Sequence, residues 1–582
     1  MVHSKSGRIL VALFMLSCLL SAQPSESGLQ TPAEQTAYQN GGTLYGPLME
    51  FIHALDKQTS LMNVQILTET LMGRKLVLCV LANPPVYSPA DLVGSDKPVV
   101  LIANNVHGGE VAGKDASLEI MRDLVTGDLR PLLDEVVVLN IPTLNPDGAE
   151  VNRRTNEQRF DMNRDYLKLE SQEIDALVRK VINVWHPDIH VDTHHGGAAP
   201  YALVYQTCMN PAGDEELIRF GNEEVLPRVR SALRAEDYDG FWYSSPRWVD
   251  GEPCWFPTSV EPRKQHVYSG LANMLGFLFE TPSNSHRVIH DGTEVVEIPE
   301  EERYRHQVRG EYIGQREMIR FAAERGEDVK RIIADARRRA VERGNNDADE
   351  DPFPIRYEQK VKFMDDFWVR KKDVDPPEFE KVRGGVYTLF SPVKTTVRPW
   401  GYVMPPELAP IIPLLLDHEI AVKRISEPTD LELEIYYANK LEHQEYFQGH
   451  YLKRLEAEKR LEALRMPAGS FFIPTGQSKS NLLCYLLEAE TNDNLITWGY
   501  LDDFLQVTTG LEEKWAKREA EMKDYLDTMN AQERERWQKR MQQQKERLNH
   551  QRIPIYRVMK KTILPGRMLE PYNGYEKNRY IR

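Results

Sequence analysis

The sequence predicts an α/β fold, with helices on both faces of a central sheet. Three short apolar runs have the length and composition of buried strands, at residues 75–81 (KLVLCVL), 98–103 (PVVLIA) and 135–141 (EVVVLNI). Between the last two runs, residues 112–129 carry apolar side chains at helical spacing. Strands that alternate with helices in this way are typical of a sheet that is covered on both faces.

The alternation continues through the first 345 residues. A helix is expected near 171–184, a strand at 188–192 (DIHVD) and a last strand at 274–279 (MLGFLF). Residues 293–345 are rich in arginine and glutamate, which predicts a long solvated helix that closes this first unit.

A charged break at 345–351 (NNDADED) separates the first unit from the rest of the chain. We therefore expect one large unit at 23–345 and a smaller α+β domain at 352–509. Residues 510–582 are expected to form a charged helix and a basic tail that folds back on the acidic body.

Within the smaller domain, strands are expected near 385–390 and 470–473, and an apolar stretch lies at 411–416. Residues 451–464 are dense in glutamate and arginine, which favours a helix there.

Composition restricts the class of protein. The chain has 582 residues, 41% hydrophobic and 28% charged, which is enough apolar material for large cores. Acidic residues outnumber lysine and arginine by 88 to 73, and the net charge of −15 disfavours binding to nucleic acid. The cysteines are too few and scattered for a disulfide scaffold or a thiolate metal site. Cys208 and Cys254 are either a disulfide pair or two buried thiols.

The N-terminus has the pattern of a secretory signal. A basic start is followed by the apolar run 9–20 and by the small residues Ser21 and Ala22. We therefore expect residues 1–22 to be a signal peptide and the mature protein to be secreted or periplasmic, with an N-terminal membrane anchor as the alternative. No later apolar run approaches the ~20 residues that a membrane span needs, so no integral span is expected once the signal is removed.

The main candidate for chemistry follows the second predicted strand, in residues 104–110 (NNVHGGE). His107 and Glu110 stand between the end of a strand and the start of a helix, so that both side chains can point to one place. Imidazole nitrogen and carboxylate oxygen are ligands that suit zinc. About one such spacing is expected by chance among fifteen histidines, so the motif alone leaves a purely structural role equally open.

A catalytic zinc needs a third protein ligand and one open position. The segment 187–197 (PDIHVDTHHGG) offers one, because His190, Asp192 and His194 share one face of a strand. His194 lies nearest the strand end and is the ligand we select. We expect His195 to point the other way and His190 to be a packed or hydrogen-bonded histidine.

Four arginines lie between these motifs, at 153, 154, 159 and 164. A guanidinium holds a carboxylate through two parallel hydrogen bonds, so the cluster suggests recognition of an anion. A set of surface salt bridges is the alternative, and it would be favoured if the zinc motif were absent.

Four motifs follow one another along the chain: His107-x-x-Glu110, Asn145-Pro-Asp-Gly148, Asp161-x-Asn163-Arg164 and the strand-end His194. In this order they resemble the zinc carboxypeptidase family of metallopeptidases, over roughly residues 45–290. The resemblance implies a mixed eight-stranded sheet flanked by helices, with 23–345 as the catalytic domain. It also implies a Zn²⁺ ion bound by His107, Glu110 and His194.

The same resemblance implies roles around the ion. Asp161 would orient the ring of His107. Asn163 and Arg164 would grip the free C-terminal carboxylate of the substrate. Arg154, or less favourably Arg153, would stabilise the developing oxyanion.

Two further residues complete the implied site. Glu280 directly follows the strand at 274–279 and would be the general base. Tyr268 would cap the substrate, with Tyr243 as the other option. The pocket for the substrate side chain would lie in 243–269, where the neutral Gln265 argues slightly against an enzyme restricted to basic residues.

The implied activity is hydrolysis of the C-terminal peptide bond of a peptide with a free carboxylate, by zinc-activated water. Two alternatives remain. The same zinc site could act on murein peptides or N-acyl amino acids, or the chain could be a non-catalytic binding protein that kept the fold.

Overall fold

The computed structural model describes residues 28–39, 41–257, 260–282, 285–347, 351–505, 520–549 and 551–569, together with residue 517. The expected signal peptide at 1–22 lies outside these ranges. Within them, none of the helices combines the length and the apolar character needed to cross a bilayer.

The first unit is built on an eight-stranded mixed sheet, as the sequence predicts. Its strand order is β1-β2-β4-β3-β5-β10-β6-β7. Strands β4, β3, β5 and β10 run parallel in the centre. On one side β2 and then β1 are added antiparallel, and on the other β6 pairs antiparallel to β10 and parallel to β7. The strands are β1 (Met62–Glu69), β2 (Lys75–Leu81), β3 (Val99–Asn104), β4 (Val137–Ile141), β5 (Ile189–His195), β6 (Leu203–Thr207), β7 (Gly240–Trp242) and β10 (Leu275–Thr281).

Both faces of this sheet are buried, which explains why its central strands are continuous apolar runs. Along β3, Val100 and Ile102 face one core while Leu101 and Ala103 face another. The first core is closed by α2 (Tyr45–Asp56), α3 (Ala112–Thr126), α8 (Leu226–Arg234), α10 (Arg303–Glu324) and α11 (Gly326–Asn345). The second is closed by α5 (Gln172–Leu177), α9 (Gln265–Leu271) and the C-terminal part of the chain.

The prediction of one long solvated helix in 293–345 is wrong. The segment holds the short strand β12 (Glu294–Glu297) and two helices, α10 and α11, which break at Arg325. Helix α10 is largely buried, because Ile313 and Ile319 pack into the first core. Several of its charged residues are paired across to other elements, as Arg316 is to Glu236 at 2.7 Å.

A second sheet forms what we call the C-terminal lobe, residues 398–505 and 551–569. Its strand order is β20-β19-β23-β17-β21-β18-β24. The bounds are β17 (Gly401–Met404), β18 (Lys423–Ile425), β19 (Thr429–Phe447), β20 (His450–Met466), β21 (Phe471–Pro474), β22 (Gln551–Arg552), β23 (Tyr556–Val558) and β24 (Gly566–Met568), with the helices α12 (Ile412–Asp417) and α13 (Ser480–Leu487).

The helix expected at 451–464 is a strand instead, since β20 pairs along almost its whole length with β19. The charges that favour a helix locally are satisfied across the hairpin, where Glu442 stands opposite Arg454. Tertiary pairing therefore overrides local propensity.

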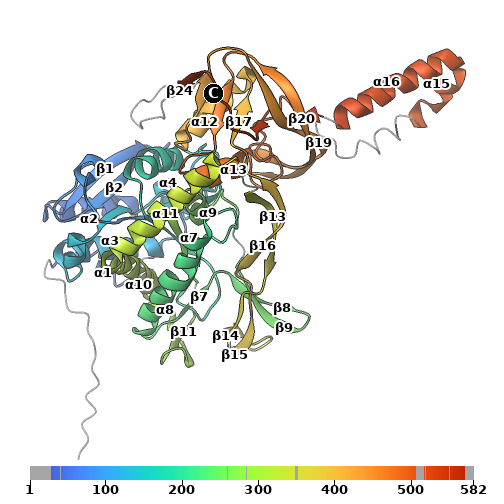
Figure 1. Cartoon of the computed structure of the whole chain (residues 1–582). Coiled ribbons are helices and arrows are strands. Elements are labelled where there is room, and N and C mark those ends of the chain that lie inside the picture. Colours follow the sequence, from blue (N-terminus) through green and yellow to red (C-terminus); the bar gives the residue numbers. More distant parts are fainter. Residues whose placement is uncertain are drawn as a thin grey trace, which may run out of the picture.

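The end of the chain divides into two parts. Helices α15 (Lys523–Thr528) and α16 (Ala531–Asn549) project away from the body (Figure 1). Residues 551–568 return to it, where β22, β23 and β24 add to the sheet of the lobe. In their described part, these residues fold back on the body as expected.

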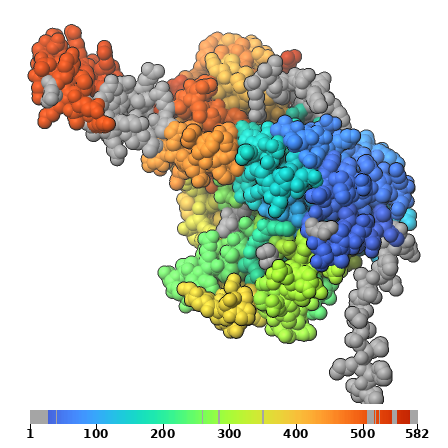
Figure 2. Space-filling model, turned by 180° about the vertical axis from the view of Figure 1, so that it is seen from behind, coloured from blue at the N-terminus to red at the C-terminus, as the bar shows by residue number. Residues whose placement is uncertain are grey.

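Two hairpins join the units. β13 (Pro352–Lys360) pairs with β16 (Leu389–Val397), and β14 (Phe363–Arg370) pairs with β15 (Phe379–Val386). β15 also pairs with β9 (Glu252–Phe256) of the first unit, which pairs in turn with β8 (Ser245–Val249). The strand expected at 385–390 falls on the turn between β15 and β16, whereas that at 470–473 corresponds to β21. The surfaces of the lobe and the first unit lie directly against each other (Figure 2).

Candidate metal centre

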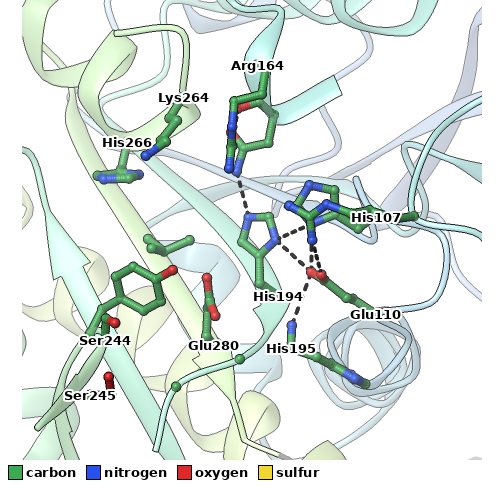
Figure 3. A pocket seen from close by; sticks show the side chains of 16 residues that line it. His107, Glu110, Arg164, His194, His195, Ser244, Ser245, Lys264, His266 and Glu280 are labelled. Carbon is green, nitrogen blue, oxygen red and sulfur yellow. Dashed lines mark hydrogen bonds and ion pairs between the residues drawn. The ribbon is translucent and has the colours of Figure 1, made fainter. Parts of the chain in front are cut away.

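Three ligand atoms converge at the ends of two neighbouring strands. His107 and Glu110 lie in the loop between β3 and α3, and His194 lies at the end of β5. Nδ1 of each histidine lies 2.8 Å from Oε2 of Glu110, and the two Nδ1 atoms are 3.1 Å apart (Figure 3). Ligands 2.0–2.1 Å from a tetrahedral zinc are ~3.3 Å from one another. This donor set therefore fits a zinc ion after small outward shifts.

The loop that carries His107 is held by its own backbone bonds and by close packing. Nδ2 of Asn105 donates to the carbonyl oxygens of His107 and Glu110, at 2.8 and 2.9 Å. A Cβ atom on Gly108 would lie 2.2 Å from the carbonyl carbon of Gly148, so that a larger residue there would separate the loop from α4 (Pro146–Glu150). The two glycine-containing motifs thus pack against each other.

A carboxylate stands behind each imidazole. Nε2 of His107 lies 2.9 Å from Asp161 Oδ1, and Nε2 of His194 lies 2.7 Å from Asp192 Oδ2. Both contacts fix the ring orientation with Nδ1 directed at the centre. The sequence analysis placed Asp192 on the same strand face as His194 but gave it no role. The alternation of β5 was the signal that could have found it.

Several charged side chains surround the carboxylate of Glu110. Burial opposes ionisation of Glu110, but His107 and His194 outweigh it and hold the pKa of this carboxyl well below its usual range. Arg154 donates to Glu110 Oε1 at 2.8 Å and to Asp161 Oδ2 at 3.0 Å. Arg153 instead pairs with Glu157, away from the centre.

Glu280 lies beside the metal-ligand set because β10 pairs with β5 in register, with Glu280 opposite His194. A Cβ atom on Gly196 would lie 1.8 Å from Glu280 Oε2, so only glycine leaves room for this carboxylate. Burial raises the pKa of Glu280 to about 7, with nearby Glu110 adding to the rise and His194 opposing it. A carboxyl with such a pKa can exchange a proton near neutral pH.

These residues line one cavity of about 290 Å³. Its walls also include Asn163 and Arg164 from the predicted arginine cluster. Asn163 is buried, and both ends of its side-chain amide have polar partners. Its Oδ1 accepts a hydrogen bond from the backbone amide of Gln265, and its Nδ2 lies 3.0 Å from His194 Nε2. Arg164 donates to the Asn163 carbonyl oxygen at 2.7 Å.

Tyr268 does not reach this cavity, and this is a correction to the sequence analysis. Its side chain is fully buried in the second core, where the hydroxyl lies 3.0 Å from Nδ1 of His418 in the lobe. The alternative, Tyr243, lines the cavity. Helix α9 turns Tyr268 toward the lobe, and no pattern in the sequence reveals that the lobe covers this face.

The expected side-chain region, 243–269, does contribute to the cavity wall. It supplies Ser244, Ser245, Lys264 and His266 in addition to Tyr243, whereas Gln265 turns inward and donates to the His190 carbonyl oxygen. These four residues were not singled out from the sequence.

The other predicted histidines differ in their distance from the centre. His190 is buried with Nδ1 3.0 Å from Ser269 Oγ. His195 lines the cavity, where its amide donates to Glu110 Oε2 at 3.2 Å, and its Nε2 accepts from the Ala112 amide. Cys208 and Cys254 are both free and buried.

The model of one protein family, Peptidase_M14 (zinc carboxypeptidase), matches residues 48–191. Over this segment the chain is similar to zinc carboxypeptidases. The matched segment contains His107 and Glu110, the parallel strands β3 and β4, and the predicted arginine cluster, while His194 and Glu280 follow it.

Several known proteins are similar to this chain. "Carboxypeptidase 2" of Trichophyton tonsurans is 22% identical over 443 residues, which cover 72% of this chain and 78% of the fungal protein. "Carboxypeptidase SOL1" of Arabidopsis thaliana is 30% identical over 120 residues, 18% of this chain and 23% of the plant protein. Among solved structures, a metallo-carboxypeptidase from Burkholderia cenocepacia is 22% identical, with a TM-score of 0.37, over 47% of this chain and 68% of its own.

Proposed function

We propose that the protein is a zinc-dependent metallocarboxypeptidase that hydrolyses the C-terminal peptide bond of peptides with a free carboxylate. The observation that carries this proposal is that three zinc-type ligands, a buried carboxylate of raised pKa and two arginines line one cavity. The groups that such a hydrolysis needs are therefore close enough to act on one bound substrate.

His107, Glu110 and His194 would hold the ion, with Asp161 and Asp192 fixing the two rings. A bound zinc ion supplies Lewis acidity at the scissile carbonyl and lowers the pKa of water. All three of these residues line the same cavity, which leaves room for a substrate beside the ion.

Glu280 is the proposed general base. It would take a proton from the attacking water as the new carbon–oxygen bond forms, and return that proton to the amine nitrogen as the carbon–nitrogen bond breaks. Its buried position beside Gly196 keeps it poised between the two protonation states near neutral pH.

The arginines have separate proposed roles. Arg154 is partly exposed and already faces the metal-ligand set, so it can donate to the oxyanion that develops there. Arg164, supported by Asn163, would hold the terminal carboxylate of the substrate. Tyr243 replaces Tyr268 as the tyrosine that could close over the substrate.

We further propose that the enzyme acts on peptides outside the cytoplasm, on the strength of the signal pattern in residues 1–22. Its net charge of −15 disfavours nucleic acid as a partner.

The test compares an N-blocked dipeptide with a free carboxylate and the same dipeptide as a C-terminal amide, using the zinc-loaded enzyme. We expect cleavage of the acid and little of the amide, and Glu280→Gln should lower kcat by about 10²–10⁴-fold with zinc still bound. Arg164→Ala should raise KM for the acid alone. Equal cleavage of the amide would overturn the exopeptidase proposal, and full turnover by Glu280→Gln would remove Glu280 as the base. Hydrolysis of N-acyl amino acids in place of peptides would support the alternative substrate.

A further inference from the structure

The segment 160–170 lies between the metal centre and the C-terminal lobe. One end carries Asp161, Asn163 and Arg164, which face the cavity or the ligand His107. The other end carries Lys168 and Glu170, which face the lobe. The zinc carboxypeptidase match ends at residue 191, so the lobe has no role in the activity proposed so far.

The tip of the long β19–β20 hairpin reaches the start of this segment. Oε1 of Gln448 accepts a hydrogen bond of 2.8 Å from the backbone amide of Asp161. A Cβ atom on the next residue, Gly449, would lie 3.6 Å from the ring of Phe160, so that the tip and the segment are in contact. Gln448 has a φ of 51°, the left-handed conformation of a tight hairpin turn.

The far end of the segment is held by the same hairpin. Nε2 of His450 lies 2.9 Å from a carboxylate oxygen of Glu170. Lys168 is fully buried, with its ammonium 2.8 Å from Asp165 and 4.8 Å from the ring of Trp498 in the lobe. A buried ammonium needs such partners, so the lobe supplies part of what keeps Lys168 in place.

The lobe also holds the second cavity loop. Asp493 accepts a 2.9 Å hydrogen bond from the Arg263 amide, next to the cavity residue Lys264, and a 2.7 Å bond from the Trp498 indole. The amide of Gln265 in turn donates to Asn163, which ties the two loops together at the cavity.

A short chain of contacts therefore links the lobe to a metal ligand. Gln448 binds the main chain of Asp161, and the Asp161 carboxylate fixes the ring of His107 at 2.9 Å and binds Arg154 at 3.0 Å. Asn163 and Arg164 follow within three residues of the same backbone. A shift at the Asp161 amide would move the ligand support and the carboxylate-binding pair together.

We propose that the C-terminal lobe is a positioning element of the active site, and that Gln448 is its positioning residue for the Asp161–Arg164 segment. The role in catalysis rests on the proposed carboxypeptidase function, whereas the effect on the metal site does not. The hairpin supplies an acceptor at a place where the segment has no regular secondary structure to hold it, apart from the single 3₁₀ turn Met162–Arg164.

The expected effects follow from that geometry. Loss of a residue that supports a metal ligand from behind typically lowers metal affinity 10–100-fold. Gln448 acts one step further away, so its loss should weaken zinc binding by about tenfold. Because the same segment holds Arg164, KM for a peptide acid should rise by a similar factor, with a smaller fall in kcat.

The test uses the full chain and two matched substitutions. Gln448→Met keeps the length of the side chain but removes the acceptor, and Gln448→Glu keeps an acceptor oxygen. Tyr446→Ala is the control, since Tyr446 lies at the same hairpin end and is exposed. Zinc affinity is measured by titration against a competing chelator, KM and kcat on a peptide acid, and the melting temperature in parallel.

We expect Gln448→Met to bind zinc more weakly and to have a higher KM than the wild type. Gln448→Glu should return both the zinc affinity and KM most of the way to the wild-type values, and the control should match the wild type. A Gln448→Met protein that melts earlier but keeps the zinc affinity and KM of the wild type would show a merely structural contact and overturn the proposal. If that variant does not fold, Gln448→Gly suits the left-handed φ and tests the same loss. A wild-type protein that binds zinc but cleaves no peptide would refute the proposed function alone, because the zinc titration would still test the positioning role.

Discussion

Substitution of Gly196 by alanine tests the placement of the proposed base without changing any ionisable group. The added Cβ atom would lie 1.8 Å from Glu280 Oε2, whereas ordinary contacts begin at 3.4 Å. The carboxylate must therefore retreat by about 1.6 Å. A misplacement of 1 Å at a reacting group costs ~10²-fold in rate, so kcat should fall by at least about 10²-fold. Gly196 is half-buried in the loop after β5, outside any helix or strand, so the melting temperature should change little.

The assay compares kcat on a peptide acid with the zinc content and melting temperature of the same preparation. Gly46→Ala is the matched control, because nothing lies within 4 Å of its added Cβ and it sits in helix α2. The reasoning would be refuted by a Gly196→Ala enzyme with wild-type kcat, or by one that has lost its zinc, since the metal ligands are not predicted to move.

Three further predictions follow from the same geometry. The proposed base must be deprotonated to act, and the pKa of Glu280 is raised to about 7, so kcat/KM should rise with pH. The half-maximal value should lie at or below pH 7, because a bound cation lowers that pKa. A profile that stays flat from pH 5 to 8 would contradict the assignment of Glu280 as the base. Asp192→Asn should weaken zinc binding by about 10–100-fold in a chelator titration, because it removes the carboxylate behind His194, and unchanged affinity would argue that this contact does not support the metal. Lys264 and His266 line the cavity, so peptides ending in glutamate should be cleaved at higher kcat/KM than peptides ending in lysine. Lys264→Glu should lower or invert the ratio of these two kcat/KM values. An unchanged ratio would show that Lys264 does not select the substrate side chain.

Local sequence patterns predict most of the strands of the first unit and the three candidate metal ligands. Buried parallel strands are continuous apolar runs, and chemistry-bearing residues follow directly where such strands end, so the pattern places His107 and His194 at one sheet edge, whereas Glu280 is assigned only through the family resemblance. Asp161 could be paired with His107 only through the family resemblance, because 54 residues separate them.

What could not be predicted depends on contacts between distant segments. Tyr268 was placed in the site because the sequence does not reveal that His418 covers it from the lobe. The β20 strand was read as a helix for the same reason, since its partner β19 satisfies the charges that helix propensity alone would assign to solvent. The spacing of residues along a chain cannot show either of these contacts.

One apolar core contains residues from both ends of the polypeptide. Leu101 and Leu139 on the catalytic sheet share it with Leu415 and Leu483. A gene truncated after residue 345 would remove part of the cover on that side of the sheet and expose its apolar residues to water, and the product should be prone to aggregation. Heating should accordingly melt the whole chain in a single cooperative step, and any transfer of the first unit to another scaffold must carry the C-terminal residues of this core with it.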